Sequence, residues 1–168
     1  MEDKKEKYSG SNPRKSASRE IKKYLAEDLP KIKFIFNSDR DCFRDPYHQW
    51  VLWNPDDYDS GRTPTEYELS AYPTEIHISK EHKSQKHRLM SILHEIGHYI
   101  LYKEKNIIPE RYRIDVILVQ EAMAWKEGLK FLDKSHWDFS FIKESLDSYK
   151  ESKFKFCVEG RRKANGKK

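Results

Sequence analysis

The chain has no apolar run of 18 or more residues, so we expect no membrane-spanning helix and no membrane partner. Its first residues, MEDKKEKYSGSNPRKS, lack the apolar core of a secretory signal peptide. Only two cysteines occur, Cys42 and Cys157, which argues against the disulfide framework of a small secreted domain. From these absences we expect a cytoplasmic protein.

Apolar residues are also scarce. They make up 36% of the 168 residues, no more than the charged residues do. That fraction supports one compact core and is too small for two. The four Trp, ten Tyr and eight Phe help to fill this core, because each aromatic side chain buries a large area.

The net charge of +5 is concentrated at the two ends of the chain. Residues 153–168 carry seven Lys/Arg against one Asp/Glu, and residues 1–15 carry five against three. We interpret 1–15 as a flexible N-terminus, 16–152 as the folded domain and 153–168 as a basic C-terminal tail. A basic tail is able to bind nucleic acid, but only Phe154 and Phe156 interleave with its charges, so the sequence supports this weakly.

The apolar pattern predicts a helix first, then strands, then more helices. A helix over 16–30 has Ser16 or Ser18 as its cap and Pro30 as its end. The class is therefore α+β, with a small, three-stranded and mostly antiparallel sheet. The strands are expected at 31–37, 47–54 and 74–80, and the later helices at about 84–103, 109–132 and 138–151.

Two connections separate the predicted strands. DCFRDP, residues 41–46, is typical of a turn. Residues 55–74 form a long polar connection with three prolines and one glycine. Connections of this length in a compact domain are usually functional or disordered, so this one is a candidate lid or substrate loop.

The stretch LMSILHEIGHYILY, residues 89–102, places two histidines four positions apart in an apolar helix. Residues four apart lie on the same helix face, so His94 and His98 are able to direct two imidazole nitrogens at one metal ion. Glu95 lies one step around the helix, beside a metal-bound water rather than among the ligands. This H-E-x-x-H pattern predicts a zinc (Zn²⁺) site with Glu95 as general base. The alternative is an ordinary amphipathic helix that carries two histidines, and the strongly apolar setting argues against it.

A catalytic zinc ion usually has three protein ligands and one open position, so a third ligand must come from outside the motif. The best candidate is Glu121, which lies on the next predicted helix, 23 residues after His98. Asp115 and Glu127 are weaker alternatives, because neither shares the helix face of Glu121 at a suitable height.

Small residues accompany Glu121 on its helix face. Ala124 and Gly128 follow it at i+3 and i+7. Gly97, inside the motif, costs about 1 kcal/mol of helix propensity relative to alanine, which is understandable if another backbone must come close. We therefore expect the second helix to approach the first at Gly97 and to bring the carboxylate to the metal.

At this point the chain resembles a known family. HEIGH, residues 94–98, followed after a hairpin by EAMAW, residues 121–125, is similar to the short zincin metallopeptidases with a glutamate as third ligand. The resemblance is greatest to the ImmA/IrrE-type metallopeptidases and to HEXXH proteins of phages and mobile elements. It covers roughly residues 16–135 and implies a minimal zincin-like fold in which an active-site helix and a glutamate helix follow the sheet.

The same resemblance implies zinc at His94, His98 and Glu121, with Glu95 as the catalytic base. It also implies an edge strand before the site helix, at TEIHIS, residues 74–79, that holds an extended substrate, although an ordinary sheet strand fits equally well. Candidates for stabilising an oxyanion stay open, and they are His77, His82, His87, Tyr99, Tyr102 and Tyr112. The chain departs from those families in two ways. Trp125 and Lys126 follow Ala124, where the families often have Asn next, and we find no sign of the helix-turn-helix DNA-binding module that often accompanies them.

Together these features predict a zinc metallopeptidase, a hydrolase that cleaves a peptide bond in a protein or peptide substrate and is a candidate phage or mobile-element regulatory protease. The alternative is a binding or regulatory protein that keeps the scaffold and acts on nucleic acid or a protein partner through its basic tails. The substitution Glu95→Gln separates the two, because it abolishes only hydrolysis.

Overall fold

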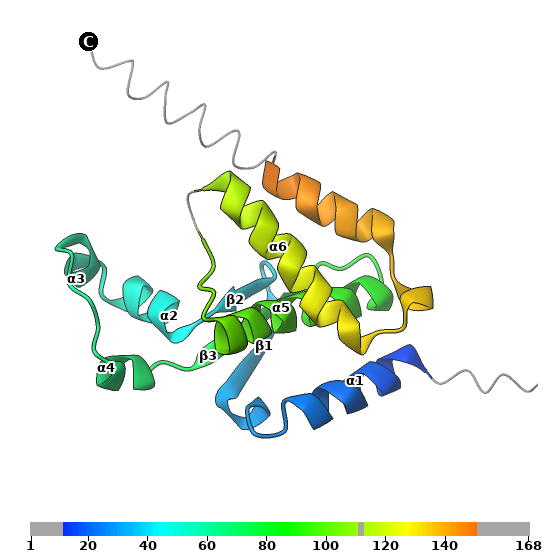
Figure 1. Cartoon of the computed structure of the whole chain (residues 1–168), viewed down its shortest axis with the longest axis horizontal. Helices are drawn as coiled ribbons and strands as arrows, with labels where there is room; N and C mark the ends of the chain where they lie inside the picture. The colour runs from blue at the N-terminus through cyan, green and yellow to red at the C-terminus, as the bar shows by residue number, and fades with distance from the viewer. Residues whose placement is uncertain (1–11, 111–112, 151–168) are drawn as a thin grey trace, which may run out of the picture.

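The computed structural model describes residues 12–110 and 113–150 and has the α+β class expected from the sequence (Figure 1). A small sheet and two long helices form its centre, and shorter helices lie around them. In chain order the elements are α1 (Pro13–Tyr24), β1 (Ile32–Ser38), β2 (Cys42–Arg44), α2 (Pro46–Trp53), α3 (Pro55–Asp59), α4 (Glu66–Ser70), β3 (Thr74–Ser79), α5 (Gln85–Lys105), α6 (Ile114–Gly128) and a last helix over 139–150. None of the described helices is long and apolar enough to cross a membrane.

Helix α1 begins three residues before the predicted boundary at residue 16. Its N-cap is Asn12, whose side chain accepts a hydrogen bond from the backbone N–H of Arg14 at 3.0 Å. Pro13 occupies the first helical position, where its missing N–H costs nothing. Ser16 and Ser18 therefore lie inside the helix and do not cap it.

The three strands are arranged in the order β1-β3-β2. Strand β1 pairs with β3 in parallel, and β2 pairs with β3 antiparallel. The sheet is therefore mixed, and its longer pairing is the parallel one, so the expectation of a mostly antiparallel sheet was wrong in this detail. Because β3 is paired on both sides, 74–79 is the ordinary sheet strand of the two alternatives and not the edge strand.

One strand was predicted in the wrong place. Residues 47–54 are aromatic and β-branched, yet they belong to α2, because Asp45 caps this helix through the N–H of His48 at 3.0 Å and Pro46 is its first residue. The missing strand is β2, which is three residues long and lies in the predicted turn.

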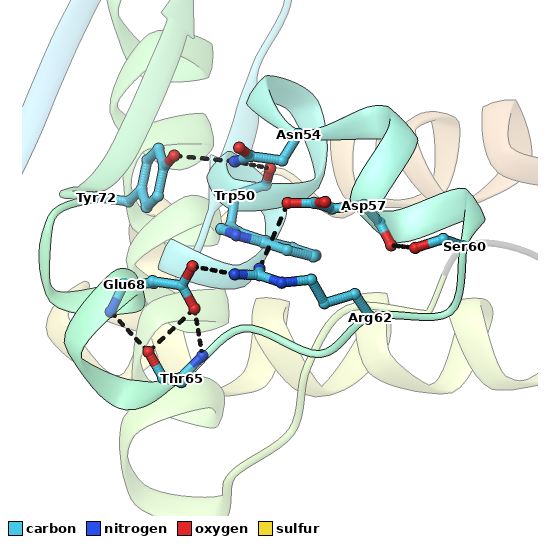
Figure 2. A network of polar contacts seen from close by, with 8 residues as sticks. All are labelled: Trp50, Asn54, Asp57, Ser60, Arg62, Thr65, Glu68 and Tyr72. Carbon is cyan, nitrogen blue, oxygen red and sulfur yellow. Dashed lines mark hydrogen bonds and ion pairs between the residues drawn. The ribbon is translucent and has the colours of Figure 1, made fainter.

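Residues 45–73, which connect β2 to β3, form an arm of three short helices that extends to one side of the sheet (Figure 1). Figure 2 shows the polar contacts that hold it. The guanidinium of Arg62 lies 5.7 Å from the ring centre of Trp50 and pairs with Asp57 and Glu68. Thr65 and Glu68 form a capping box at the start of α4. The long polar connection predicted over 55–74 thus contains two short helices, α3 and α4.

Helices α5 and α6 pack in direct backbone contact. A Cβ added at Gly97 would lie 1.9 Å from the carbonyl oxygen of Ala124, and one added at Gly128 would lie 1.9 Å from that of Leu93. Only glycine fits at either crossing point. The expected approach of the two helices through a face of small residues is confirmed.

The last helix, 139–150, agrees with the prediction for 138–151 and packs through Ile142 and Leu146 against the core. The predicted basic tail 153–168 lies outside the described residues, as does most of the predicted N-terminal segment 1–15.

Candidate metal centre

The structure brings His94, His98 and Glu121 together in the interior. Nε2 of His94 lies 2.9 Å from Oε2 of Glu121, and Nε2 of His98 lies 3.4 Å from Oε1 of the same carboxylate. All three side chains are buried, and one ligand atom from each lies within 4.8 Å of the other two. These residues form a group that can hold a metal ion.

Aromatic neighbours fix the two imidazole rings. Trp125 of α6 packs on His94, with 4.3 Å between the ring centres, and Phe43 of β2 stacks on His98 at 6.3 Å. Trp125 follows Ala124 directly in the sequence, and its place against His94 gives it a structural role beside a candidate ligand.

The three groups are electrostatically coupled. Burial lowers the pKa of His94 and favours the neutral imidazole that a metal requires. Burial also opposes charge on His98, but the hydrogen bond and the charge of Glu121 outweigh it and raise the pKa of His98. Burial opposes charge on Glu121 as well, yet its hydrogen bonds with His94 and His98 hold the pKa of this carboxylate far below its usual range.

The donor set fits a zinc ion. Two imidazole nitrogens and one carboxylate oxygen are ligands found in catalytic zinc sites. At metal–ligand distances of about 2.1 Å, tetrahedral ligand atoms are separated by roughly 3.4 Å, so the three groups need only small movements to bind one ion. The same set also accommodates other divalent transition metals.

Glu95 is buried beside the three groups and is not one of them. Burial raises the pKa of its carboxyl to about 8, although the charge of His98 and a hydrogen bond from the backbone N–H of Phe43 act in the opposite direction. A carboxyl group that exchanges its proton near neutral pH is suited to general acid–base work.

Glu95 and His94 lie in a cleft of about 400 Å³. Its walls come from α5, α6, the segments next to β2 and β3, and helix 139–150. No residue of the arm 45–73 lines it, so the lining gives no support to the prediction of a lid or substrate loop in 55–74. The lining residues are Arg40, Asp41, Ser79, Glu81, His82, Ser91, His94, Glu95, Trp125, Phe141, Glu144, Ser145, Ser148 and Tyr149.

The two alternative third ligands lie elsewhere. Asp115 is exposed at the start of α6 and pairs with Arg113 at 3.0 Å. Glu127 is buried, but its carboxylate pairs with Lys105 at 3.0 Å and with Lys130. Neither carboxylate belongs to the group formed with His94 and His98.

Among the candidate oxyanion donors, His82 lines the cleft, and its Nε2 lies 3.2 Å from Oδ1 of Asp41. His77 is hydrogen-bonded to Glu75 and Ser38 on β3 and β1 and does not line the cleft.

The other candidates are also accounted for. His87 stacks on Phe141 with the two rings 4.2 Å apart. Tyr99 and Tyr102 pack against Phe43, and neither lines the cleft. Tyr112 lies outside the described residues.

Two residues of the cleft were not found from the sequence. Asp41 accepts a hydrogen bond from the backbone N–H of Ser79 at 2.6 Å and faces His82, a long-range pairing without any local signal. Tyr149 lines the cleft from helix 139–150, and burial together with the charges of Glu121 and Glu95 raises the pKa of its hydroxyl group. Its spacing of four from Ser145 was a signal, because it places both residues on one face of a predicted helix.

No family model, curated protein or solved structure matches the chain. The resemblance to the glutamate-ligand zincins therefore stays a prediction from the two motifs.

Proposed function

We propose that the protein is a zinc-dependent metallopeptidase that cleaves a peptide bond in a protein or peptide. The observation that carries the proposal is the convergence of His94, His98 and Glu121 in the interior, with His94 and the buried Glu95 lining a cleft. Ligands from two helices and a separate carboxylate are the parts that metal-assisted hydrolysis requires.

When bound, zinc supplies Lewis acidity, which lowers the pKa of a water molecule toward about 7 and polarises a carbonyl group. Glu95 takes the proton from the attacking water and later delivers it to the leaving amine. A cation held by His94, His98 and Glu121 would favour the ionised form of Glu95, which is the form that acts as a base.

The negative charge that develops on the carbonyl oxygen needs a hydrogen-bond donor in the cleft. His82 supports this role, because it lines the same cleft as Glu95 and is paired with Asp41. Asp41 orients the imidazole through this contact.

The test compares the wild-type protein with Glu95→Gln, both loaded with zinc. Each is incubated with a mixture of peptides of many sequences, and new peptide ends are identified by mass spectrometry. We expect cleavage by the wild type and a loss of about a thousandfold or more in Glu95→Gln, with zinc still bound. Glu104→Gln, on the same helix and away from the cleft, serves as the matched control and should cleave normally.

Equal cleavage by Glu95→Gln and the wild type would contradict the role of Glu95. Absence of cleavage by zinc-loaded wild-type protein would favour the binding protein instead. That alternative depends on the basic tails, so it predicts nucleic-acid binding that weakens steeply with salt and is lost when 153–168 is removed.

A further inference from the structure

Helix α1 concentrates positive charge on its exposed face. Its 12 residues include five Lys/Arg and one Glu, whereas the arm of residues 45–73 has one Arg and six Asp/Glu. Ala17 and Ile21 are buried against the core, so the charged side chains of α1 point away from it. The helix and the arm lie on different sides of the molecule (Figure 1). Charge is therefore segregated on the folded domain, and α1 is its basic side.

Most of these cations have no partner among the residues that the structure describes. Arg19 lies 3.7 Å from Glu20, and both side chains are exposed. The other four are exposed and form no ion pair with another described residue, and they are Arg14, Lys15, Lys22 and Lys23. Unpaired like charges on one helix repel each other and reduce its stability. Such a surface attracts an external anion, whose binding relieves the repulsion.

A groove of about 530 Å³ lies along this face of α1. It is lined by Asn12, Arg14, Lys15, Ser18, Arg19 and Lys22. Residues four apart share a helix face, so the lining consists of two adjacent rows along the helix, one with Arg14 and Lys22 at its ends and one with Lys15 and Arg19. Rows of Lys and Arg side chains, with a serine hydroxyl between them, are the groups that contact a sugar–phosphate backbone.

A second groove, of about 410 Å³, adjoins the first at Arg14, which lines both. Its other lining residues come from β1 and from the first half of α5, and they are Phe36, Gln85, Arg88, Leu89 and Ile92. This groove therefore differs from the first, because it combines an aromatic ring and apolar side chains with an amide and two guanidinium groups.

Phe36 is the central feature of the second groove. It is a large apolar side chain at the surface, 50% exposed, and the guanidinium carbon of Arg88 lies 5.6 Å from the centre of its ring. The ring of Phe34 stacks beside it at 6.3 Å. Aromatic rings and the planes of Arg side chains are the surfaces on which unpaired nucleic-acid bases stack, and an amide such as that of Gln85 hydrogen-bonds to base edges.

We propose that this face binds single-stranded nucleic acid: the groove at Phe36 takes a base, and the groove along α1 takes the phosphates that follow it. The cations continue for about two helical turns beyond Arg14, which favours a polymer over a single nucleotide. An anionic membrane would use the same cations but has no base to place on Phe36. The surface belongs to the folded domain and is separate from the tail 153–168, and its role does not depend on the metal centre.

The first experiment measures binding of a fluorescent oligothymidylate of about 20 nucleotides by anisotropy, over a series of salt concentrations. The full-length wild type is compared with Arg14→Ala/Lys22→Ala. The control, Lys126→Ala/Lys143→Ala, removes the same charge from exposed sites outside both grooves. We expect binding by the wild type, at least about tenfold weaker binding by the α1 variant, and a salt slope reduced by about 1.4, since each phosphate contact on a single strand contributes about 0.7. The control should bind like the wild type.

The second experiment tests base stacking with Phe36→Leu, which keeps an apolar side chain at this half-exposed position and removes the aromatic face. We expect it to weaken oligothymidylate binding at least about fivefold and to leave the salt slope unchanged. Heparin is a polyanion without bases, so its binding should be the same in Phe36→Leu and the wild type. Thermal unfolding of the variant should stay close to that of the wild type.

Several results would overturn the proposal. One is oligothymidylate binding that survives Arg14→Ala/Lys22→Ala and is lost only when 153–168 is removed, because the tail would then be the binding site. Another is oligothymidylate binding unchanged by Phe36→Leu, which would indicate a general surface for polyanions. A third is binding to vesicles that contain phosphatidylserine without binding to oligothymidylate. None of these results changes the expectation for zinc, so this proposal and the proposed function fail separately.

Discussion

The pair formed by α5 and α6 and the arm of residues 45–73 are built in opposite ways. The helix pair is held by backbone contact at Gly97 and Gly128 and encloses buried charged groups. The arm is held by side chains near the surface, centred on Arg62 (Figure 2). It also leaves large aromatic side chains in solvent. Trp53 is 73% exposed and Tyr67 is 87% exposed.

The two regions therefore differ in how much stability they lose to buried charged groups. Buried ionisable groups such as Glu95 and Glu121 reduce stability unless they are paired or bind a cation. The helix pair tolerates them because its backbones fit closely and its apolar residues pack on the sheet. The arm contains no comparable group of buried ligands, so substitutions there should change stability without affecting metal binding.

The largest effect is expected for Gly97→Ala. The added methyl group would overlap the backbone of Ala124, so α6 must move away and carry Glu121 with it. Despite better helix propensity, we expect a loss of about 3 kcal/mol in the free energy of unfolding, at the upper end for overpacking, and loss of tight zinc binding. Urea unfolding and chelator competition measure the two effects.

Gly61→Ala, in the arm, sharpens the contrast. Gly61 has a φ of +79° and nothing within 4 Å of an added Cβ, so its substitution costs only backbone strain of about 1–2 kcal/mol. Zinc affinity should be unchanged. A smaller cost for Gly97→Ala than for Gly61→Ala would show that the helix pair does not depend on close backbone packing.

The second effect is a pH dependence that comes from Glu95. In the metal-free protein its pKa is raised from 4.5 to about 8, so the folded state holds this proton more tightly than the unfolded chain. The contribution of protonated Glu95 to the free energy of unfolding is fully present below about pH 4.5 and is lost as the pH rises through 8. Glutamine stays neutral, so Glu95→Gln should unfold several degrees above the wild type at pH 9 and close to it at pH 5. Thermal scans of chelator-treated protein at both pH values measure this effect. The same difference in unfolding temperature between Glu95→Gln and the wild type at pH 5 and pH 9 would contradict it.

The smallest effect is expected in the network of Figure 2. Arg62→Ala removes the ion pairs with Asp57 and Glu68, but these groups are partly exposed and screened by solvent. We expect the midpoint of thermal unfolding to fall by at most about 2 °C, with zinc affinity unchanged. A loss of zinc binding in this variant would show that the arm and the helix pair are coupled.

The sequence was informative where a pattern persists over several turns. The motif around His94 and the small face of Ala124 and Gly128 are local patterns, and they placed Glu121 and the helix crossing where the structure has them. The sequence was misleading at 47–54. The aromatic residues there favour a strand, but the N-cap Asp45 starts a helix.

Other features had no local signal strong enough to find them. Strand β2 is three residues long and exists because β3 lies beside it. Tyr149 joins the lining of the cleft only once helix 139–150 has packed beside α5 and α6, which no pattern of one segment reveals.

The central claim is that His94, His98 and Glu121 bind one zinc ion, and metal content tests it most directly. The wild type, His98→Ala, Glu121→Ala and the control Asp115→Ala are incubated with zinc, desalted and analysed by elemental mass spectrometry. We predict one zinc per chain in the wild type and in Asp115→Ala, and little or none in the other two variants. Wild-type protein without stoichiometric zinc, or Glu121→Ala with a full complement, would contradict the three-ligand site.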